Sequence, residues 1–257
     1  SQLPPQMREF FERFGGAPNG GRQRERRAQG SGFFISADGY VVTNNHVIDD
    51  AEDITVGLSD GRDFEAEVVG TDPETDLALL RVSADVEFDY VELDRDPDTR
   101  VGDWVVAMGN PFGLGGTATT GIISAMGRQI GPAQAYTDFL QTDASINRGN
   151  SGGPMFDLNG DVVGVNSAII SPTGGNVGIG FAIPSDLAAR IIDQLIESGE
   201  VRRGYLGVSP GDLTEELKDA MGLGRDVEGA LINQVLADTP AEDAGLENGE
   251  IGRASCR

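Results

Sequence analysis

Short hydrophobic runs that alternate with polar residues dominate the chain from Phe33 to about Pro184. Dipeptides containing glycine separate many of these runs, among them Asp38-Gly39, Asp60-Gly61 and Asn159-Gly160. Such dipeptides supply the positive φ angles that tight hairpins need. The predicted hairpins pair residues 33–35 with 40–42, 54–58 with 64–68, and 155–158 with 162–165. Many short strands joined in this way predict a barrel or a sandwich, because closure removes exposed strand edges.

A single long helix is predicted directly after the strand region. Ser185-Asp186 fits an N-cap followed by an acidic first turn, and Gly199 is a natural C-terminal stop. The apolar stripe between them consists of Leu187, Ile191, Leu195 and Ile196. We expect this helix to complete a β domain of residues 31–199, and residues 200–204 read as a linker.

A second, smaller unit is predicted over residues 205–251. It contains a helix near 214–221 and a second helix start at Thr239-Pro240-Ala241-Glu242. There Thr239 is the expected cap, proline occupies the first helical position, and Glu242 completes a capping box. Residues 252–257 continue no periodic pattern and read as a non-native tail.

Residues 1–30 read as an N-terminal arm. Its four large apolar residues have the spacing of one face of a short helix: Met7, Phe10, Phe11 and Phe14. This face is expected to pack either on its own domain or against another subunit. The basic run of the arm from Arg22 to Arg27 contrasts with a formal net charge of −23 for the whole chain.

The composition excludes several functional classes. An acidic chain with a sequence pI of about 4.2 lacks the Lys and Arg that nucleic-acid binding requires. A sole cysteine, Cys256, excludes an intrachain disulfide. No hydrophobic run approaches the ~20 residues of a membrane helix. No signal peptide is recognisable, so an exported protein is expected to appear here in its mature form.

Three residues have the chemistry of nucleophilic catalysis. Ser151 lies in the glycine-rich string NRGNSGGP, where glycines let the backbone approach a substrate closely. A serine needs a base to remove its proton and a third group to orient that base. His46 is the only histidine of the chain, so histidine-driven chemistry must use it. Asp76 begins a hydrophobic strand, where a partly buried carboxylate needs a donor such as an imidazole N–H.

The strings around these residues resemble the HtrA/Deg family of serine proteases. TNNHVI, DPETDLALLRV and NRGNSGGPMFDLNGDVVGVNSAI carry the likeness in the β region, and NVGIGFAIPS and RRGYLGV extend it. The resemblance runs nearly continuously from about residue 30 to about residue 250. It implies an all-β, chymotrypsin-like fold of two perpendicular barrels with a C-terminal helix, followed by an incomplete PDZ segment of α+β type.

The resemblance also implies the roles of individual residues. His46 would be the general base, Asp76 its orienting group and Ser151 the nucleophile. The oxyanion hole would lie in the backbone of Gly149, Asn150 and Ser151. The specificity pocket would be lined by Ser167, Ala168 and Ile169, whose small apolar character favours a small aliphatic residue before the cleaved bond. The segments near Arg148 and 171–178 resemble the regulatory loops of the family.

Partners follow from the same resemblance. Family members act without ATP, cofactor or metal on unfolded proteins in the bacterial envelope, which implies a periplasmic location, and they form trimers or multiples of trimers. Their PDZ domain captures extended peptides by strand addition. Its carboxylate-binding loop would be Tyr205, Leu206, Gly207 and Val208. The PDZ segment ends about halfway, so it cannot bury a normal core.

Two other classes of protein remain open at this point. A non-enzymatic chaperone or scaffold would bind unfolded segments through the same cleft, and chaperone activity can coexist with proteolysis. An esterase-type hydrolase would use similar chemistry, but Ser151 lies between strands rather than at the strand-to-helix elbow of α/β hydrolases. The intact Ser, His and Asp set favours the protease.

Overall fold

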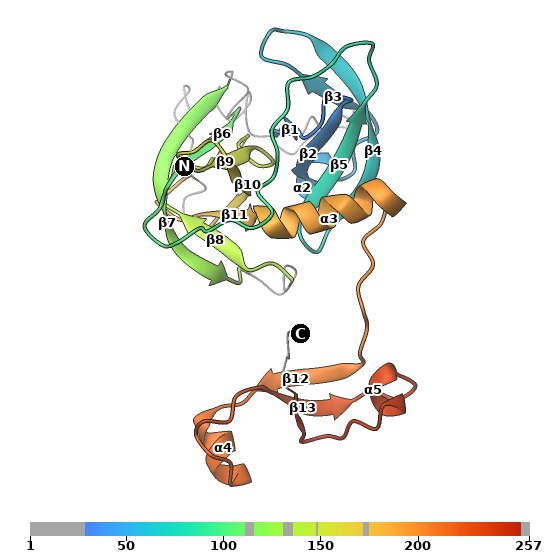
Figure 1. The fold of residues 1–257 in the computed structure, drawn as a ribbon, viewed down its shortest axis with the longest axis vertical. Helices are drawn as coiled ribbons and strands as arrows, with labels where there is room; N and C mark the ends of the chain where they lie inside the picture. Colours follow the sequence, from blue (N-terminus) through green and yellow to red (C-terminus); the bar gives the residue numbers. More distant parts are fainter. Residues whose placement is uncertain (1–28, 111–115, 131–135, 148, 172–174, 253–257) are drawn as a thin grey trace, which may run out of the picture. The chain divides into compact units, whose positions relative to one another are not determined.

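The computed structural model describes residues 29–110, 116–130, 136–147, 149–171 and 175–252 (Figure 1). The chain divides into two compact units between Val201 and Arg202. The predicted N-terminal helix, Arg148, part of the 171–178 segment and the predicted tail from residue 253 onward lie outside the described residues.

The first unit is built almost entirely from β-strands. Its elements are β1 (Phe33–Phe34), β2 (Tyr40–Asn44), α2 (Asn45–Ile48), β3 (Ile54–Gly57), β4 (Asp63–Asp72), β5 (Leu77–Val82), β6 (Trp104–Gly109), β7 (Thr117–Arg128), β8 (Phe139–Thr142), β9 (Pro154–Phe156), β10 (Val162–Ile169), β11 (Gly180–Pro184) and α3 (Ser185–Ser198). The predicted all-β architecture is therefore confirmed.

The strands form two sheets. One has five strands in the order β1-β2-β5-β4-β3, and the other closes into a barrel in the order β10-β11-β8-β7-β6-β9. The three predicted hairpins are present as antiparallel pairs β1–β2, β3–β4 and β9–β10. Glycines at their turns have positive φ, as at Gly39 (102°) and Gly160 (93°), which explains why the turns use glycine.

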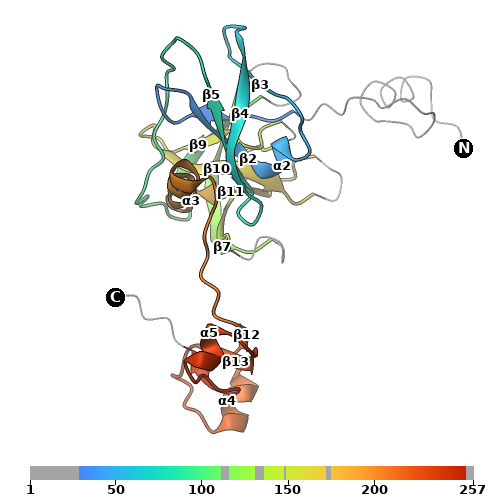
Figure 2. The ribbon, with the colours of Figure 1, turned by 90° about the vertical axis from the view of Figure 1, so that its right-hand side faces the viewer.

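Helix α3 joins the two sheets. It packs on β4 and β5 of the five-stranded sheet and on β10 and β11 of the barrel, as Figures 1 and 2 show. Its predicted stop is confirmed, because Gly199 adopts φ 73° and its N–H donates to Leu195 O. The predicted cap is wrong: Pro184 occupies the N-cap position, and Ser185 is the first helical residue and is buried.

Three hydrophobic clusters account for the packing of this unit. One lies within the barrel and includes Val105, Ile123 and Met155, and a second lies within the five-stranded sheet. The third joins both sheets to α3, and its members include Leu77, Phe181 and Leu195. Burying a side chain of this size stabilises the fold by roughly 1.5–3 kcal/mol, so the third cluster fixes the two sheets against each other.

The second unit is a small three-stranded sheet with two short helices. It comprises β12 (Val208–Asp212), α4 (Glu215–Met221), β13 (Ala230–Val235), α5 (Pro240–Asp243) and β14 (Ile251–Gly252). Both predicted helices are present, and the side chains of Thr214 and Thr239 cap them. The Glu242 carboxylate accepts from Asp238 N–H rather than from the cap residue, so the predicted capping box is modified.

The described part of the chain contains no helix with the length and hydrophobicity of a membrane span.

Candidate active site

Asp76 and His46 meet at one end of the five-stranded sheet. Asp76 directly precedes β5, and His46 lies in the short helix α2 that follows β2. Because β2 and β5 are paired from Asn44 with Leu77 onward, the residues beyond this end of the pair come together. His46 Nδ1 lies 2.9 Å from Asp76 Oδ1 and 2.8 Å from Oδ2. The structure thus joins two of the three predicted catalytic side chains.

The backbone at Asp76 is held in an uncommon conformation. Its φ of 60° lies in the left-handed region, which aspartate tolerates better than most residues. The Asp76 carbonyl accepts from Asn44 Nδ2 at 2.9 Å and from Asn45 N–H at 3.1 Å. These two bonds aim the carboxylate back at α2, where it also accepts from the His46 N–H at 3.0 Å.

The contact with Asp76 determines what the imidazole can do. An ionised carboxylate only accepts hydrogen bonds, so the proton on the neutral ring is held at His46 Nδ1. Nε2 is then left as an acceptor. The His46 side chain is 49% exposed whereas that of Asp76 is 8% exposed, so the basic nitrogen is accessible to a reactant.

Ser167 donates a further hydrogen bond to Asp76. Its Oγ lies 2.8 Å from Asp76 Oδ2. The register of β10 against β11 shifts between Asn166 and Ala168, which leaves Ser167 as an extra residue in the ladder. Such bulges redirect a side chain, and here the redirected hydroxyl reaches from the barrel to a carboxylate of the other sheet. The sequence predicted Ser167 only as part of a specificity pocket.

Ser151 belongs to residues 149–153, called here the serine loop. The loop lies against the strand that leads to His46. A Cβ at Gly152 would meet Thr43 Oγ1, Ser31 O and Asn44 N, and its φ is 87°, so only glycine fits. This close approach brings Ser151 beside the segment that carries His46. Within the described residues, no hydrogen bond joins the Ser151 hydroxyl to the imidazole. Catalytic hydrogen bonds are often long in unliganded structures and shorten when substrate binds.

The amides of the serine loop fall into two groups. The N–H groups of Asn150, Gly152 and Gly153 donate to Asn147 O, Asn166 O and Asn150 O, respectively. Over the described ranges, the N–H groups of Gly149 and Ser151 have no acceptor. These two amides are therefore the donors of the loop that are unpaired within the described residues. The Asn150 amide, which the sequence assigned to the oxyanion hole, is already engaged and its residue is buried.

A cavity of about 200 Å³ adjoins Ser151. Its lining consists of Ile146, Asn147, Ser151, Ser167, Ala168, Ile169 and Ser171. The predicted pocket residues 167–169 are thus brought to the predicted nucleophile. The volume is below that of sites for drug-sized ligands, which begin at roughly 300 Å³, and it is large enough for a single side chain.

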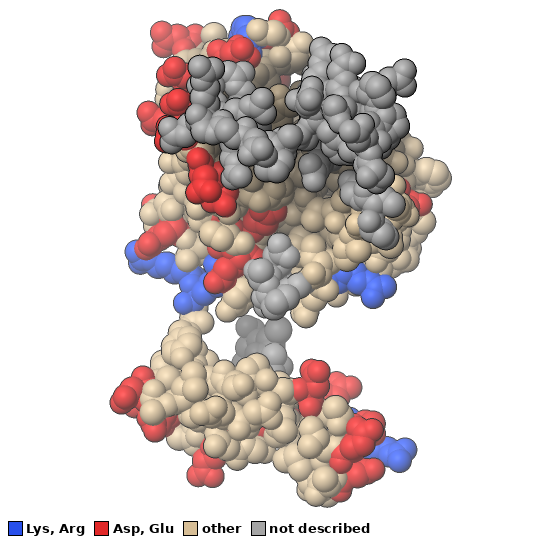
Figure 3. All heavy atoms as spheres, turned by 180° about the vertical axis from the view of Figure 1, so that it is seen from behind, with Lys and Arg blue, Asp and Glu red and all other residues tan. Residues whose placement is uncertain are grey.

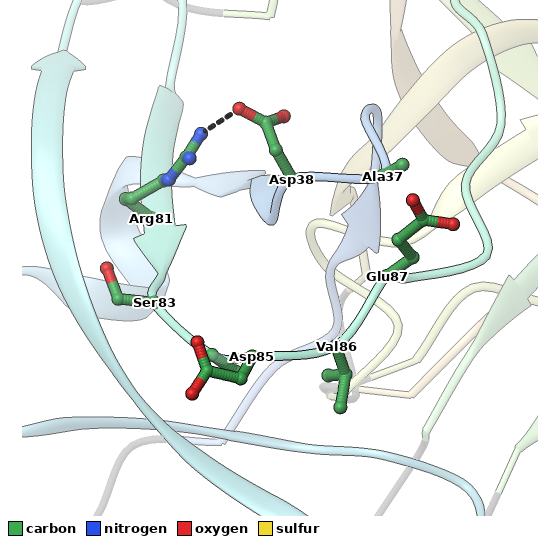
Figure 4. A pocket seen from close by; sticks show the side chains of 8 residues that line it. Ala37, Asp38, Arg81, Ser83, Asp85, Val86 and Glu87 are labelled. Carbon is green, nitrogen blue, oxygen red and sulfur yellow. Dashed lines mark hydrogen bonds and ion pairs between the residues drawn. The ribbon is translucent and has the colours of Figure 1, made fainter.

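A second hollow of about 730 Å³ lies elsewhere on the first unit (Figure 4). Asp38 and Arg81 form an ion pair of 2.7 Å at its edge, with Asp85, Val86 and Glu87 around it. Hydrogen bonds from the Ser36 side chain and from Arg81 lower the pKa of Asp38. The lining of this second hollow includes none of the predicted site residues. It contains no nucleophilic side chain paired with a base.

The predicted PDZ loop lies in the second unit. Tyr205 and Leu206 are exposed, while Gly207 has a φ of 87° and is packed against Thr239. The carbonyls of Leu206 and Gly207 accept from Ala241 N–H and Leu236 N–H. Peptide binding by this loop stays a prediction.

Sequence reasoning missed two residues of this site, Ser31 and Asn44, and the contact of a third, Ser167, with Asp76. Ser31 contacts the serine loop, Asn44 supports the Asp76 carbonyl, and Ser167 supports the Asp76 carboxylate. Asn44 had a weak signal, since it lies two positions before the only histidine. The roles of Ser31 and Ser167 depend on contacts between distant segments and have no local signal.

Comparison with protein families and curated proteins agrees with this geometry. The model of a trypsin-like peptidase domain matches residues 30–165, just over half of the chain. A probable periplasmic serine endoprotease, DegP-like, from Bartonella henselae is 54% identical over 97% of this chain. The corresponding protein of Rhizobium meliloti is 53% identical over 91%. The alignments cover 51% and 46% of these relatives, so the chain spans about half their length.

Solved structures give the same likeness. An HtrA-type protease, AlgW, solved with a decapeptide, matches with a TM-score of 0.76 and 48% identity over 86% of this chain and 67% of that one. A serine endoprotease from Yersinia pestis matches with a TM-score of 0.68 and 41% identity over 89% of this chain and 73% of that one. At these identities the likeness covers sequence as well as fold.

Proposed function

Because this chain belongs to the HtrA family of trypsin-like serine peptidases, we propose that it is a serine endopeptidase that cleaves unfolded or misfolded proteins. It acts without ATP, and its location is the periplasm, as the names of its relatives suggest. The observation that supports this most strongly is the pairing of His46 with a buried Asp76, beside a cavity that Ser151 lines.

The reaction proceeds through an acyl-enzyme. Ser151 Oγ attacks the carbonyl carbon of the peptide while His46 Nε2 takes the hydroxyl proton. Asp76 stabilises the imidazolium that forms and keeps the ring in the correct tautomer. As the C–N bond breaks, the imidazolium returns its proton to the leaving amine. A water molecule then attacks the acyl carbon, with His46 again as base, and releases the second product.

The Gly149 and Ser151 amides stabilise the negative charge on the attacked carbonyl oxygen. Their N–H groups have no acceptor within the described residues, which is the state that an oxyanion site requires before substrate arrives. Losing one such donor typically lowers turnover by ~10²–10³. The Asn150 amide does not contribute, because it donates to Asn147 O.

Substrate selection uses the cavity of about 200 Å³ next to Ser151. Its lining from Ser167, Ala168 and Ile169 fits a residue such as Val or Ala before the cleaved bond. On this assignment, cleavage after Val or Ala is faster than cleavage after Phe or Lys.

The remaining parts of the chain serve substrate capture and assembly. We assign residues 1–30 to an N-terminal arm, 31–199 to the protease domain, 200–204 to a linker and 205–251 to a PDZ-type segment. Residues 205–208 receive the end of an extended peptide, and the protein assembles as a trimer or a multiple of trimers. These assignments follow the family, and the chain spans only half the length of its relatives.

Cleavage of unfolded casein tests the proposal. The unaltered chain degrades casein and reacts with a fluorophosphonate at Ser151. Ser151→Ala loses both, with a fall in turnover on the order of 10⁶-fold, the size seen when such a nucleophile is removed. The matched control is Ser83→Ala, which removes an exposed hydroxyl at the other hollow and leaves both signals intact.

Two results would contradict the assignment. Undiminished casein cleavage by Ser151→Ala excludes Ser151 as the nucleophile. Tight binding of casein by the unaltered chain, with neither cleavage nor fluorophosphonate labelling, favours the non-enzymatic chaperone instead.

A further inference from the structure

Ser31 makes an unusual set of contacts for a half-buried serine that precedes the first strand. Its N–H donates to Ser151 O at 2.8 Å, and its hydroxyl donates to Gly149 O at 2.6 Å. One residue thus holds two carbonyls of the serine loop, on either side of the Asn150–Ser151 peptide. The N–H of that peptide is one of the two amides that have no acceptor within the described residues.

Ser31 is itself fixed from two directions. Its hydroxyl accepts from Asn110 N–H at 2.8 Å, and its carbonyl accepts from Thr43 Oγ1 at 2.7 Å. Asn110 follows β6 of the barrel, and Thr43 lies in β2 of the five-stranded sheet. A hydroxyl that accepts one bond polarises the bond that it donates. The orientation of the Ser31 hydroxyl is therefore determined, and it points at the Gly149 carbonyl.

The other contacts of the serine loop leave this carbonyl dependent on Ser31. The bonds from Asn150 N–H to Asn147 O and from Gly153 N–H to Asn150 O are internal to residues 147–153. The bond from Gly152 N–H to Asn166 O anchors the loop to β10 on its C-terminal side. Among the described residues, the Ser31 hydroxyl is the one hydrogen-bond donor to Gly149 O. Gly149 has a φ of 100°, in a region that only glycine adopts readily, so its peptide planes rotate easily unless they are held.

We propose that Ser31 is a positioning residue that holds the serine loop in the form in which the Ser151 amide is directed at the substrate carbonyl. The inference rests on the proposed peptidase function for its catalytic consequence. Ser31 touches no reacting atom. It acts by fixing the Gly149 carbonyl through its side chain and the Ser151 carbonyl through its backbone, so that the peptide between them cannot turn.

Ser31→Ala tests this role, because it removes the hydroxyl and keeps the backbone bond to Ser151 O. We expect kcat on a peptide substrate to fall about tenfold, less than the ~10²–10³ that follows loss of an oxyanion donor itself. KM is unchanged, since the cavity lining is intact. Affinity for a peptide boronic acid, which forms the tetrahedral adduct, falls about as much as kcat, whereas affinity for the cleaved product peptide does not change.

Ser36→Ala is the matched control. Like Ser31→Ala, it removes a serine hydroxyl that accepts from a backbone N–H, in this case Tyr40 N–H of the five-stranded sheet at 3.1 Å, away from the serine loop. The control keeps kcat and boronate affinity. Equal losses of kcat and boronate affinity in the two variants, or a loss in Ser31→Ala that appears in KM alone, would overturn the proposal.

Amide hydrogen exchange gives a readout that does not depend on activity. The N–H groups of Asn150, Gly152 and Gly153 are hydrogen-bonded in the folded chain. In Ser31→Ala they exchange at least severalfold faster, while amides of the barrel strands do not. If the unaltered chain neither cleaves casein nor reacts with fluorophosphonate, the peptidase proposal fails, and the exchange rates still decide whether Ser31 holds the loop. Unchanged exchange at these three amides refutes the positioning role.

Discussion

At the scale of single residues, Asp76 carries the most contacts of the site. Its carbonyl takes two donors from Asn44 and Asn45, and its carboxylate takes three from the His46 backbone, the His46 ring and Ser167. A buried carboxylate without donors would be costly. Here every donor also fixes direction, so the imidazole has one orientation and one tautomer.

We predict that Asp76→Asn lowers kcat by about 10⁴ while the chain stays folded. An amide can donate to Nδ1, which favours the wrong tautomer and places the proton on Nε2. Asparagine tolerates the left-handed backbone that Asp76 adopts, so the thermal midpoint changes little. Peptide cleavage and thermal unfolding measure the two effects. Asp38→Asn, at another aspartate that pairs with a basic side chain, is the control and keeps its activity. Full activity in Asp76→Asn would exclude the proposed role.

At the scale of elements, the sequence predicted the turns and helix ends that depend on a few neighbouring residues. Hairpins at Asp38-Gly39 and Asn159-Gly160 follow from turn geometry, and the end of α3 at Gly199 follows from its left-handed φ. The N-cap at Ser185 was wrong because this serine is itself the first, buried residue of the helix, and its hydroxyl has no partner among the described residues. Tertiary packing there overrides the capping preference.

The contrast between features set by neighbouring residues and features set by tertiary packing also explains which parts of the site were predictable. Ser151, His46 and Asp76 stand in strings whose residue types suit their chemistry. The bulge that aims Ser167 at Asp76 arises from the pairing of β10 with β11, and the contact of Ser31 with Gly149 joins the first strand region to a loop of the barrel. Neither contact is signalled by a periodic pattern of hydrophobic and polar residues in the sequence.

The ion pair between Arg95 and Asp193 gives a prediction for α3. Arg95 Nη1 and Nη2 lie 2.6 and 2.9 Å from the two Asp193 oxygens, which ties the segment before β6 to the helix. The hydrogen bonds from Arg95 lower the pKa of Asp193. A lowered folded-state pKa stabilises the fold above the ordinary aspartate pKa, and this stabilisation is lost as the pH falls through the lower, folded-state value.

Arg95→Gln should therefore reduce the free energy of unfolding at pH 7 by no more than about 1 kcal/mol, since the side chains of Arg95 and Asp193 are 67% and 51% exposed and solvent screens the pair. The difference from the unaltered chain should shrink as the pH drops below the ordinary aspartate range. Urea unfolding at several pH values measures it. Arg190→Gln, which breaks the pair with Asp186 on the same helix, is the comparison. A difference that grows on acidification would contradict the assigned sign.

At the scale of the whole chain, the two units differ in how they are stabilised. The first has three hydrophobic clusters, whereas the buried hydrophobic residues described in the second are Ile232 and Ala241. A sheet with so small a core is marginal in water. Both units carry Asp and Glu over the face drawn in Figure 3, in line with the net charge of −23. This self-repulsion opposes compaction and weakens with added salt.

We predict one cooperative thermal transition for the chain, and it belongs to the first unit. Removing residues 202–257 should leave the midpoint of that transition nearly unchanged, because the residues of its three clusters end at Val201. Calorimetry of the whole and shortened chains measures both quantities. A second cooperative transition, present in the whole chain and absent from the shortened one, would show that the second unit has a stable core of its own.

The solitary imidazole makes the protein its own spectroscopic reporter. Because His46 is the only histidine and its Nδ1 faces a carboxylate, nitrogen-15 incorporated into histidine yields a single pair of ring resonances, and their shifts identify the protonated nitrogen directly. An inhibitor, a denaturant or a change of acidity can each be followed at the base itself, without resonance assignment and without an added label.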